Sequence, residues 1–109
     1  MNNPSYPPQW DKRNSARHKV GVMVTIPAGD KKVMTRDLSL EGCFIPGLDL
    51  GPVGATVSIR MDIPGFGTLP LEGKVVHKGR EGEGTGMEFV SLTPEAIEWL
   101  DKFLSIFNL

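Results

Sequence analysis

The chain has 109 residues, a length that fits one domain able to fold without disulfides or a metal. Its single cysteine excludes an intramolecular disulfide, and no apolar run approaches the roughly 20 residues that span a bilayer. The net charge of −1 favours neither nucleic acid nor membrane as a partner, and the first ten residues lack the pattern of a signal peptide, so we expect a cytoplasmic protein.

The N-terminal segment differs in character from the rest of the chain. Residues 1–11 contain three prolines among polar residues, which predicts a flexible arm. Residues 12–19 follow as a polar loop without apolar periodicity. Four basic residues against one acidic residue give residues 1–20 a net charge of +3, which suggests a local anion site. We therefore expect an arm at 1–11 and one folded domain at 12–109.

Alternation of apolar residues with polar or small ones then predicts β-strands. The pattern is clear from Val20 to Ile26 and clearest from Thr56 to Ile63. Most of the 13 glycines and nine prolines fall between the alternating segments, as the turns of a meandering antiparallel barrel require. Six strands are expected, at residues 20–26, 32–39, 43–45, 56–63, 69–77 and 85–90.

The pattern changes to a helical period near the C-terminus. Thr93 is a suitable N-cap, Pro94 suits the first helical position, and Glu95 favours the positive helix start. Apolar residues recur every three or four positions up to Phe107, opposite charged ones. We therefore expect a mainly β fold, a six-stranded antiparallel β-barrel with a C-terminal amphipathic helix over one end.

Two short motifs flank the first predicted strand. Arg13 and Arg17 form an R-x-x-x-R pattern in the polar loop, and Asp37, Ser39 and Gly42 form a D-x-S-x-x-G pattern at the end of the second predicted strand. Each pattern alone is common. Together, within a barrel pattern that ends in a helix, they closely resemble the signature of PilZ domains, bacterial receptors for cyclic di-GMP. The resemblance extends over nearly the whole chain.

This resemblance implies that Arg13 and Arg17 hold phosphates and guanines of cyclic di-GMP. It also implies that Asp37 and Ser39 bind from the barrel surface and that Gly42 shapes the adjacent turn. The chemistry agrees, because guanidinium can fork onto phosphate, stack on a base or bind guanine O6 and N7. An ionised carboxylate can accept the N–H groups of guanine. Glycine permits a positive φ or a close ligand approach.

Lys12 and His77 are secondary candidates for the same site. Lys12 adds a positive charge to the arginine loop. His77 falls on a late strand where relatives often place an aromatic residue against a guanine, and it offers a smaller ring. Ligand binding is expected to change the conformation of the arginine loop and so signal to an unidentified partner protein. We expect no cofactor or metal besides this ligand, no polymeric nucleic acid partner and no membrane insertion.

Other functions fit these residues less well. An adaptor of the same fold that ignores the nucleotide remains an alternative, although intact motifs argue against it. A binder of single-stranded nucleic acid needs an aromatic platform and a basic groove, whereas the barrel region is net acidic. No nucleophile–base pair indicates an enzyme. We expect Cys43 to be a small core or strand residue rather than a nucleophile. We also expect His18 to be exposed and the glycine-rich residues 79–84 to form a hairpin turn.

Overall fold

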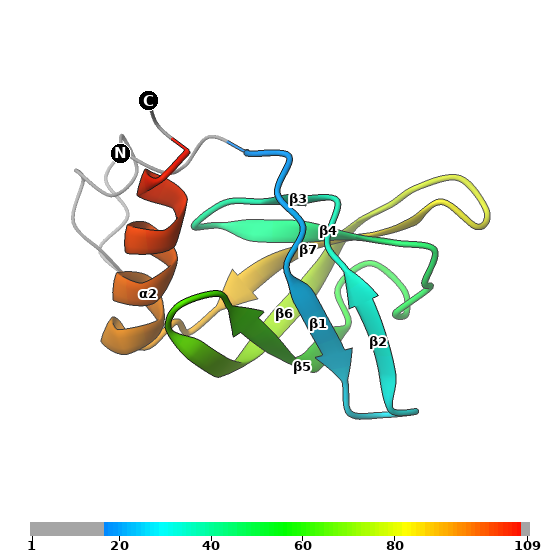
Figure 1. Ribbon diagram of the computed structural model, residues 1–109. Coiled ribbons are helices and arrows are strands. Elements are labelled where there is room, and N and C mark those ends of the chain that lie inside the picture. Colours follow the sequence, from blue (N-terminus) through cyan, green and yellow to red (C-terminus); the bar gives the residue numbers. More distant parts are fainter. Residues whose placement is uncertain (1–16, 108–109) are drawn as a thin grey trace, which may run out of the picture.

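The computed structural model describes residues 17–107, which form an antiparallel sheet curled into a half-barrel with a helix at one end (Figure 1). The sheet order is β2-β1-β5-β6-β7-β4-β3. This confirms the expected mainly β fold with a C-terminal helix, but with seven strands in place of six. The elements are β1 (Met23–Ile26), β2 (Lys31–Met34), β3 (Asp37–Leu38), β4 (Gly42–Pro46), β5 (Thr56–Ile63), β6 (Gly67–Lys78), β7 (Gly84–Val90) and α2 (Pro94–Ser105).

The additional strand arises because the predicted strand at 32–39 turns a corner. β2 pairs with β1, whereas β3 pairs with β4 at the other edge of the sheet. Thr35 holds the corner. Its hydroxyl donates to the Val20 carbonyl at 2.8 Å and accepts from the Val22 N–H at 3.1 Å, and its own N–H donates to the Val22 carbonyl at 3.0 Å. Val20 and Val22 therefore form hydrogen bonds with Thr35 in the corner, and β1 begins at Met23 rather than at residue 20 as predicted.

The core lies inside the curl of the sheet. β5 and β6 pair along their whole shared length and alternate buried with exposed side chains, as the sequence predicts. Fully burying one large aliphatic side chain contributes about 1.5–3 kcal/mol. The largest side chains below 2% exposure are Leu38, Ile45, Ile59, Met61, Ile63, Met87, Leu100, Leu104, Val22, Val24 and Val75.

The C-terminal helix α2 begins where the sequence predicts. Thr93 Oγ1 accepts a hydrogen bond from the Ala96 N–H at 3.1 Å, and Pro94 lies in the first turn. The apolar face of α2 packs into the core at the end of the half-barrel. Trp99 lies near Phe66 of the β5–β6 turn, with ring centroids 5.9 Å apart. Among residues 17–107, no helix is long and apolar enough to cross a membrane.

Candidate functional site

Arg17 and Asp37 lie 20 positions apart in the sequence and meet in the structure. Two backbone hydrogen bonds, of 3.0 and 2.9 Å, join His18 to Leu38 and anchor the end of the polar loop beside β3. Arg17 Nη1 then donates to Asp37 Oδ1 at 2.7 Å, with 48% of the arginine side chain and 16% of the aspartate side chain exposed. An ion pair this open contributes at most about 1 kcal/mol, so both groups can exchange partners at small cost.

Arg36 is a further arginine beside Asp37, and it was missed in the sequence analysis. Its Nε lies 3.8 Å from Asp37 Oδ2, and its Nη1 lies 3.9 Å from Glu83 Oε2 in the β6–β7 turn. Its guanidinium carbon lies 3.8 Å from the centroid of the Phe44 ring. Neighbouring residues of a strand point to opposite faces. Arg36 lies in the corner between β2 and β3 and belongs to neither strand, so this alternation does not apply to it and its side chain can lie beside Asp37.

Ser39 and Gly42 build the turn that follows β3. The Ser39 N–H donates to the Gly42 carbonyl at 2.9 Å, and Ser39 Oγ accepts from the N–H groups of Glu41 and Gly42 at 3.1 and 3.2 Å. Ser39 does not lie on the barrel surface as expected, because it is buried and its hydroxyl oxygen serves the turn that places Asp37. Gly42 has no positive φ. Glycine is required there because an added Cβ would collide with the Met87 carbonyl of β7.

A row of four residues crosses the outer face of the sheet from Asp37 to His77. Asp37 pairs with Phe44, Phe44 with Gly86, and Gly86 with His77. Directly paired residues share one face, and strands are about 4.8 Å apart, so the row is about 14 Å long. Gly86 brings no side chain, and the exposed His77 lies beside it. The structure therefore places His77 on the face of Asp37 but at the far end of the row.

The remaining sequence candidates are placed as follows. Lys12, Arg13 and the arm at 1–11 lie outside the described residues. Cys43 points into the core, and burial raises the pKa of its thiol to about 12, so the thiol stays protonated at neutral pH. His18 is half-buried rather than exposed, because Phe107 beyond α2 packs near it at 6.2 Å between ring centroids.

Two further observations concern possible metal ligands and the glycine-rich turn. Within residues 17–107, no group of three His, Cys, Asp or Glu residues could hold a metal ion. The predicted hairpin turn at 79–84 is confirmed. The Gly79 N–H donates to the Gly84 carbonyl at 3.1 Å, and both Gly82 and Gly84 have a positive φ, which glycine adopts without strain.

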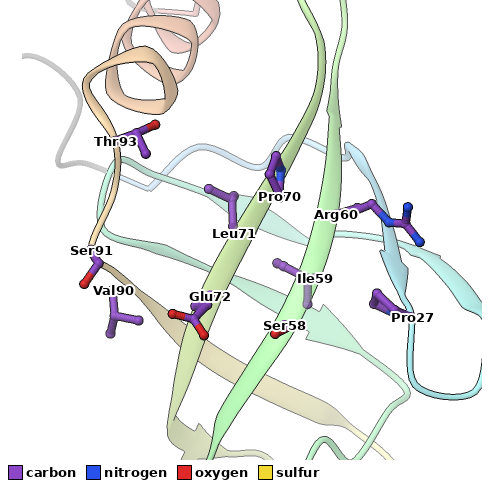
Figure 2. Close-up of a pocket in the computed structure, with 10 residues that line it drawn as sticks. All are labelled: Pro27, Ser58, Ile59, Arg60, Pro70, Leu71, Glu72, Val90, Ser91 and Thr93. Carbon is purple, nitrogen blue, oxygen red and sulfur yellow. The ribbon is translucent and has the colours of Figure 1, made fainter.

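A separate groove lies on the outer face of β5 and β6 (Figure 2). It has a volume of about 410 Å³. Glu72 in this groove and His77 in the row are both on β6, and the five residues from one to the other span about 16 Å. The groove is therefore distinct from the Arg17–Asp37 site. Its lining residues are Pro27, Ser58, Ile59, Arg60, Pro70, Leu71, Glu72, Val90, Ser91 and Thr93.

The family comparison covers both motifs of this site. The family model for the PilZ domain matches residues 11–105, which is most of the chain. The fold and the motifs thus define a protein built on a PilZ half-barrel, and the chain belongs to the PilZ domain family. Among curated protein sequences, no match to the chain is found.

Solved structures of PilZ-containing proteins are similar in fold. The Bacillus subtilis inhibitor of motility (MotI/DgrA) has a TM-score of 0.67 at 14% identity, over 84% of this chain and 48% of that one. Escherichia coli YcgR in complex with c-di-GMP has a TM-score of 0.67 at 15% identity, over 88% and 45%. This chain therefore spans about half the length of these two proteins. The PilZ domain of Escherichia coli YcgR with c-di-GMP has a TM-score of 0.58 at 17% identity, over 89% of both chains.

Proposed function

We propose that this chain is a receptor that binds cyclic di-GMP through Arg13, Arg17, Asp37, Ser39 and Gly42. The observation that carries the proposal is the Arg17–Asp37 ion pair, which joins the two motifs on the outer side of the half-barrel. Membership of the PilZ domain family supports the choice of ligand. Two of the similar structures are complexes with c-di-GMP, which also supports it.

Binding proceeds by exchange of the partners of this ion pair. Cyclic di-GMP presents two anionic phosphodiesters and two guanines. The Asp37 carboxylate accepts N–H donors from the Watson–Crick edge of a guanine, and Arg17 turns to a phosphate or to guanine O6 and N7. Hydrogen bonds to charged groups contribute about 1.5–3 kcal/mol each. They replace an exposed ion pair that contributes less, so the exchange favours the bound state.

The turn at Ser39 supports this exchange by holding Asp37 in place. Its two N–H···Oγ hydrogen bonds fix the backbone directly after β3. Gly42 allows β4 to approach β7 closely, so that Asp37, Phe44 and Gly86 stand in one row. Ser39 and Gly42 thus shape the ligand surface.

Signalling follows from the polar loop at residues 12–19, which connects the arm at 1–11 to the barrel. Lys12, Arg13 and Arg17 repel one another until phosphates neutralise them. Ligand binding therefore draws the loop onto the half-barrel and presents a changed surface to a partner protein. His77 contacts the ligand from the far end of the row. The chain acts as a receptor and not as an enzyme.

Calorimetric titration with four compounds tests this function. Cyclic di-GMP, cyclic di-AMP, GTP and a single-stranded oligonucleotide are each added to the whole chain. We expect saturable binding of cyclic di-GMP at concentrations where the other three give none. Preferential binding of the oligonucleotide would indicate a nucleic-acid binder. Absence of binding to all four compounds would contradict the proposal and favour an adaptor that works by protein contact alone.

A further inference from the structure

Arg36 presents a flat cationic surface to solvent in the middle of the candidate site. Its guanidinium carbon lies 3.8 Å from the centroid of the Phe44 ring, and 54% of its side chain is exposed. Phe44 points to the outer face of the sheet but is only 5% exposed, and Arg36 is one of the residues that lie against its ring. The guanidinium thus rests on an aromatic ring while about half of the Arg36 side chain remains exposed to solvent.

The two carboxylates beside Arg36 do not fix its guanidinium by hydrogen bonds. Asp37 and Glu83 lie 3.8 and 3.9 Å away, which is beyond hydrogen-bond distance. Asp37 makes its short contact with Arg17 instead. Within the described residues, Arg36 therefore combines a backing ring with donors that are free to meet a ligand.

The charge around Arg36 favours a base over a phosphate. Asp37 and Glu83 flank the guanidinium and offset its charge, so a phosphate gains little attraction there. A neutral planar base does not need net positive charge, so the neighbouring carboxylates do not weaken its binding. Arginine planes and aromatic rings both stack on bases. Two neighbouring carboxylates also suit guanine, whose Watson–Crick edge carries adjacent N–H donors that a carboxylate accepts.

We infer that Arg36 is a further ligand-contacting residue, which stacks on one guanine of cyclic di-GMP over the Phe44 ring. The inference rests on the proposed function. Gly86 lies beside Phe44 in the row and carries no side chain, so nothing on that strand rises between the stacked base and His77. Arg36 thereby sets specificity for a planar base at a point that neither sequence motif includes.

Calorimetric titration of cyclic di-GMP into Arg36→Ala and Arg36→Lys variants tests this inference. Loss of one stacking contact is expected to weaken binding about tenfold in Arg36→Ala. Arg36→Lys is expected to lose nearly as much, because an ammonium group keeps the charge but has no plane. The alkyl chain of the lysine is expected to cover Phe44 still, so weaker binding in this variant would not be explained by exposure of the Phe44 ring or loss of the fold. The matched control is Arg60→Ala, which removes an exposed arginine of β5 in the separate groove and is expected to bind as the wild type does.

Three results would overturn the inference, and they separate it from the proposed function. If Arg36→Ala binds with wild-type affinity while Arg17→Ala does not, Arg36 makes no contact and the proposed site stands. If Arg36→Lys binds with wild-type affinity while Arg36→Ala binds more weakly, Arg36 supplies charge rather than a stacking surface. If the wild type itself binds no cyclic di-GMP, the proposed function and the inference both fall.

Discussion

Asp37 lies between two arginines, at 2.7 Å from Arg17 and 3.8 Å from Arg36. The position of Asp37 also depends on the turn that follows β3, which the buried Ser39 hydroxyl holds by two hydrogen bonds. A carboxylate held in this way can replace an arginine by the N–H edge of a guanine without moving its backbone. The proposed role of Asp37 is therefore an exchange of one hydrogen-bonding partner for another.

Replacement of Asp37 by alanine should weaken binding of cyclic di-GMP and reduce discrimination against cyclic di-AMP. A lost charge-assisted hydrogen bond costs about 1.5–3 kcal/mol, and the lost carboxylate is the group proposed to recognise guanine. Titration of both cyclic dinucleotides into the variant measures the effect. Asp62→Ala, on the exposed face of β5, is the control. Full affinity and full selectivity in Asp37→Ala would show that Asp37 does not read guanine.

The buried Cys43 thiol is expected to make the free energy of unfolding fall as pH rises in the alkaline range. Burial raises the pKa of its thiol from 9.0 to about 12. The unfolded chain therefore ionises first, and stability present below pH 9 is lost as pH rises toward 12. Between pH 8 and 10, the free energy of unfolding of the wild type should fall about 1 kcal/mol more than that of Cys43→Ala. Urea denaturation at both pH values measures this, and an equal fall in the two proteins would contradict it.

Among the elements, β5, β6 and α2 could be predicted because local patterns determine them. Their alternating or helical spacing directly reflects which side chains meet the core. The corner between β2 and β3 could not be predicted, because Thr35 forms it with hydrogen bonds to residues more than ten positions earlier. The same limit applies to the site. The motifs predict that Arg17 and Asp37 belong to one ligand site, whereas the position of Arg36 beside Asp37 depends on the corner.

Removal of the Thr35 hydroxyl should destabilise the corner. In Thr35→Val, the Val22 N–H and the Val20 carbonyl lose a buried partner, which should lower the free energy of unfolding by about 2 kcal/mol. Thr35→Ser keeps the hydroxyl and should lose clearly less. Urea denaturation of the three proteins measures the difference. If Thr35→Val is as stable as the wild type, the corner is held by other contacts.

Across the whole molecule, the proposed ligand surface lies on β3, β4 and β7, and β3 is hydrogen-bonded to His18 near the end of the polar loop. These strands belong to one sheet with β5 and β6, and its core continues under α2 at the end of the half-barrel (Figure 1). We therefore expect the half-barrel to stay unchanged when ligand binds. The polar loop at 12–19 carries all four of the Lys and Arg residues found in the first 20 positions. Ligand binding should therefore alter one edge of a preformed scaffold.

Amide hydrogen exchange measures this division between loop and scaffold. On addition of cyclic di-GMP, protection should rise across residues 12–19, with smaller gains at 37–42 and little change at 94–107. The physical reason is that phosphates neutralise the loop, while the helix makes no proposed contact with ligand. Equal protection of residues 12–19 with and without ligand would mean that the loop is preformed, and the signalling step would then be wrong.

The pairing of the two motifs into one ligand site is tested most directly by titrating cyclic di-GMP into the wild type, Arg17→Ala and Arg17→Lys. Arg17→Ala should weaken binding by about 1.5–3 kcal/mol, and Arg17→Lys should not restore it, because an ammonium group cannot fork or stack. Thermal unfolding without ligand should barely change, since the Arg17–Asp37 pair is exposed. Wild-type affinity in Arg17→Ala would contradict the account.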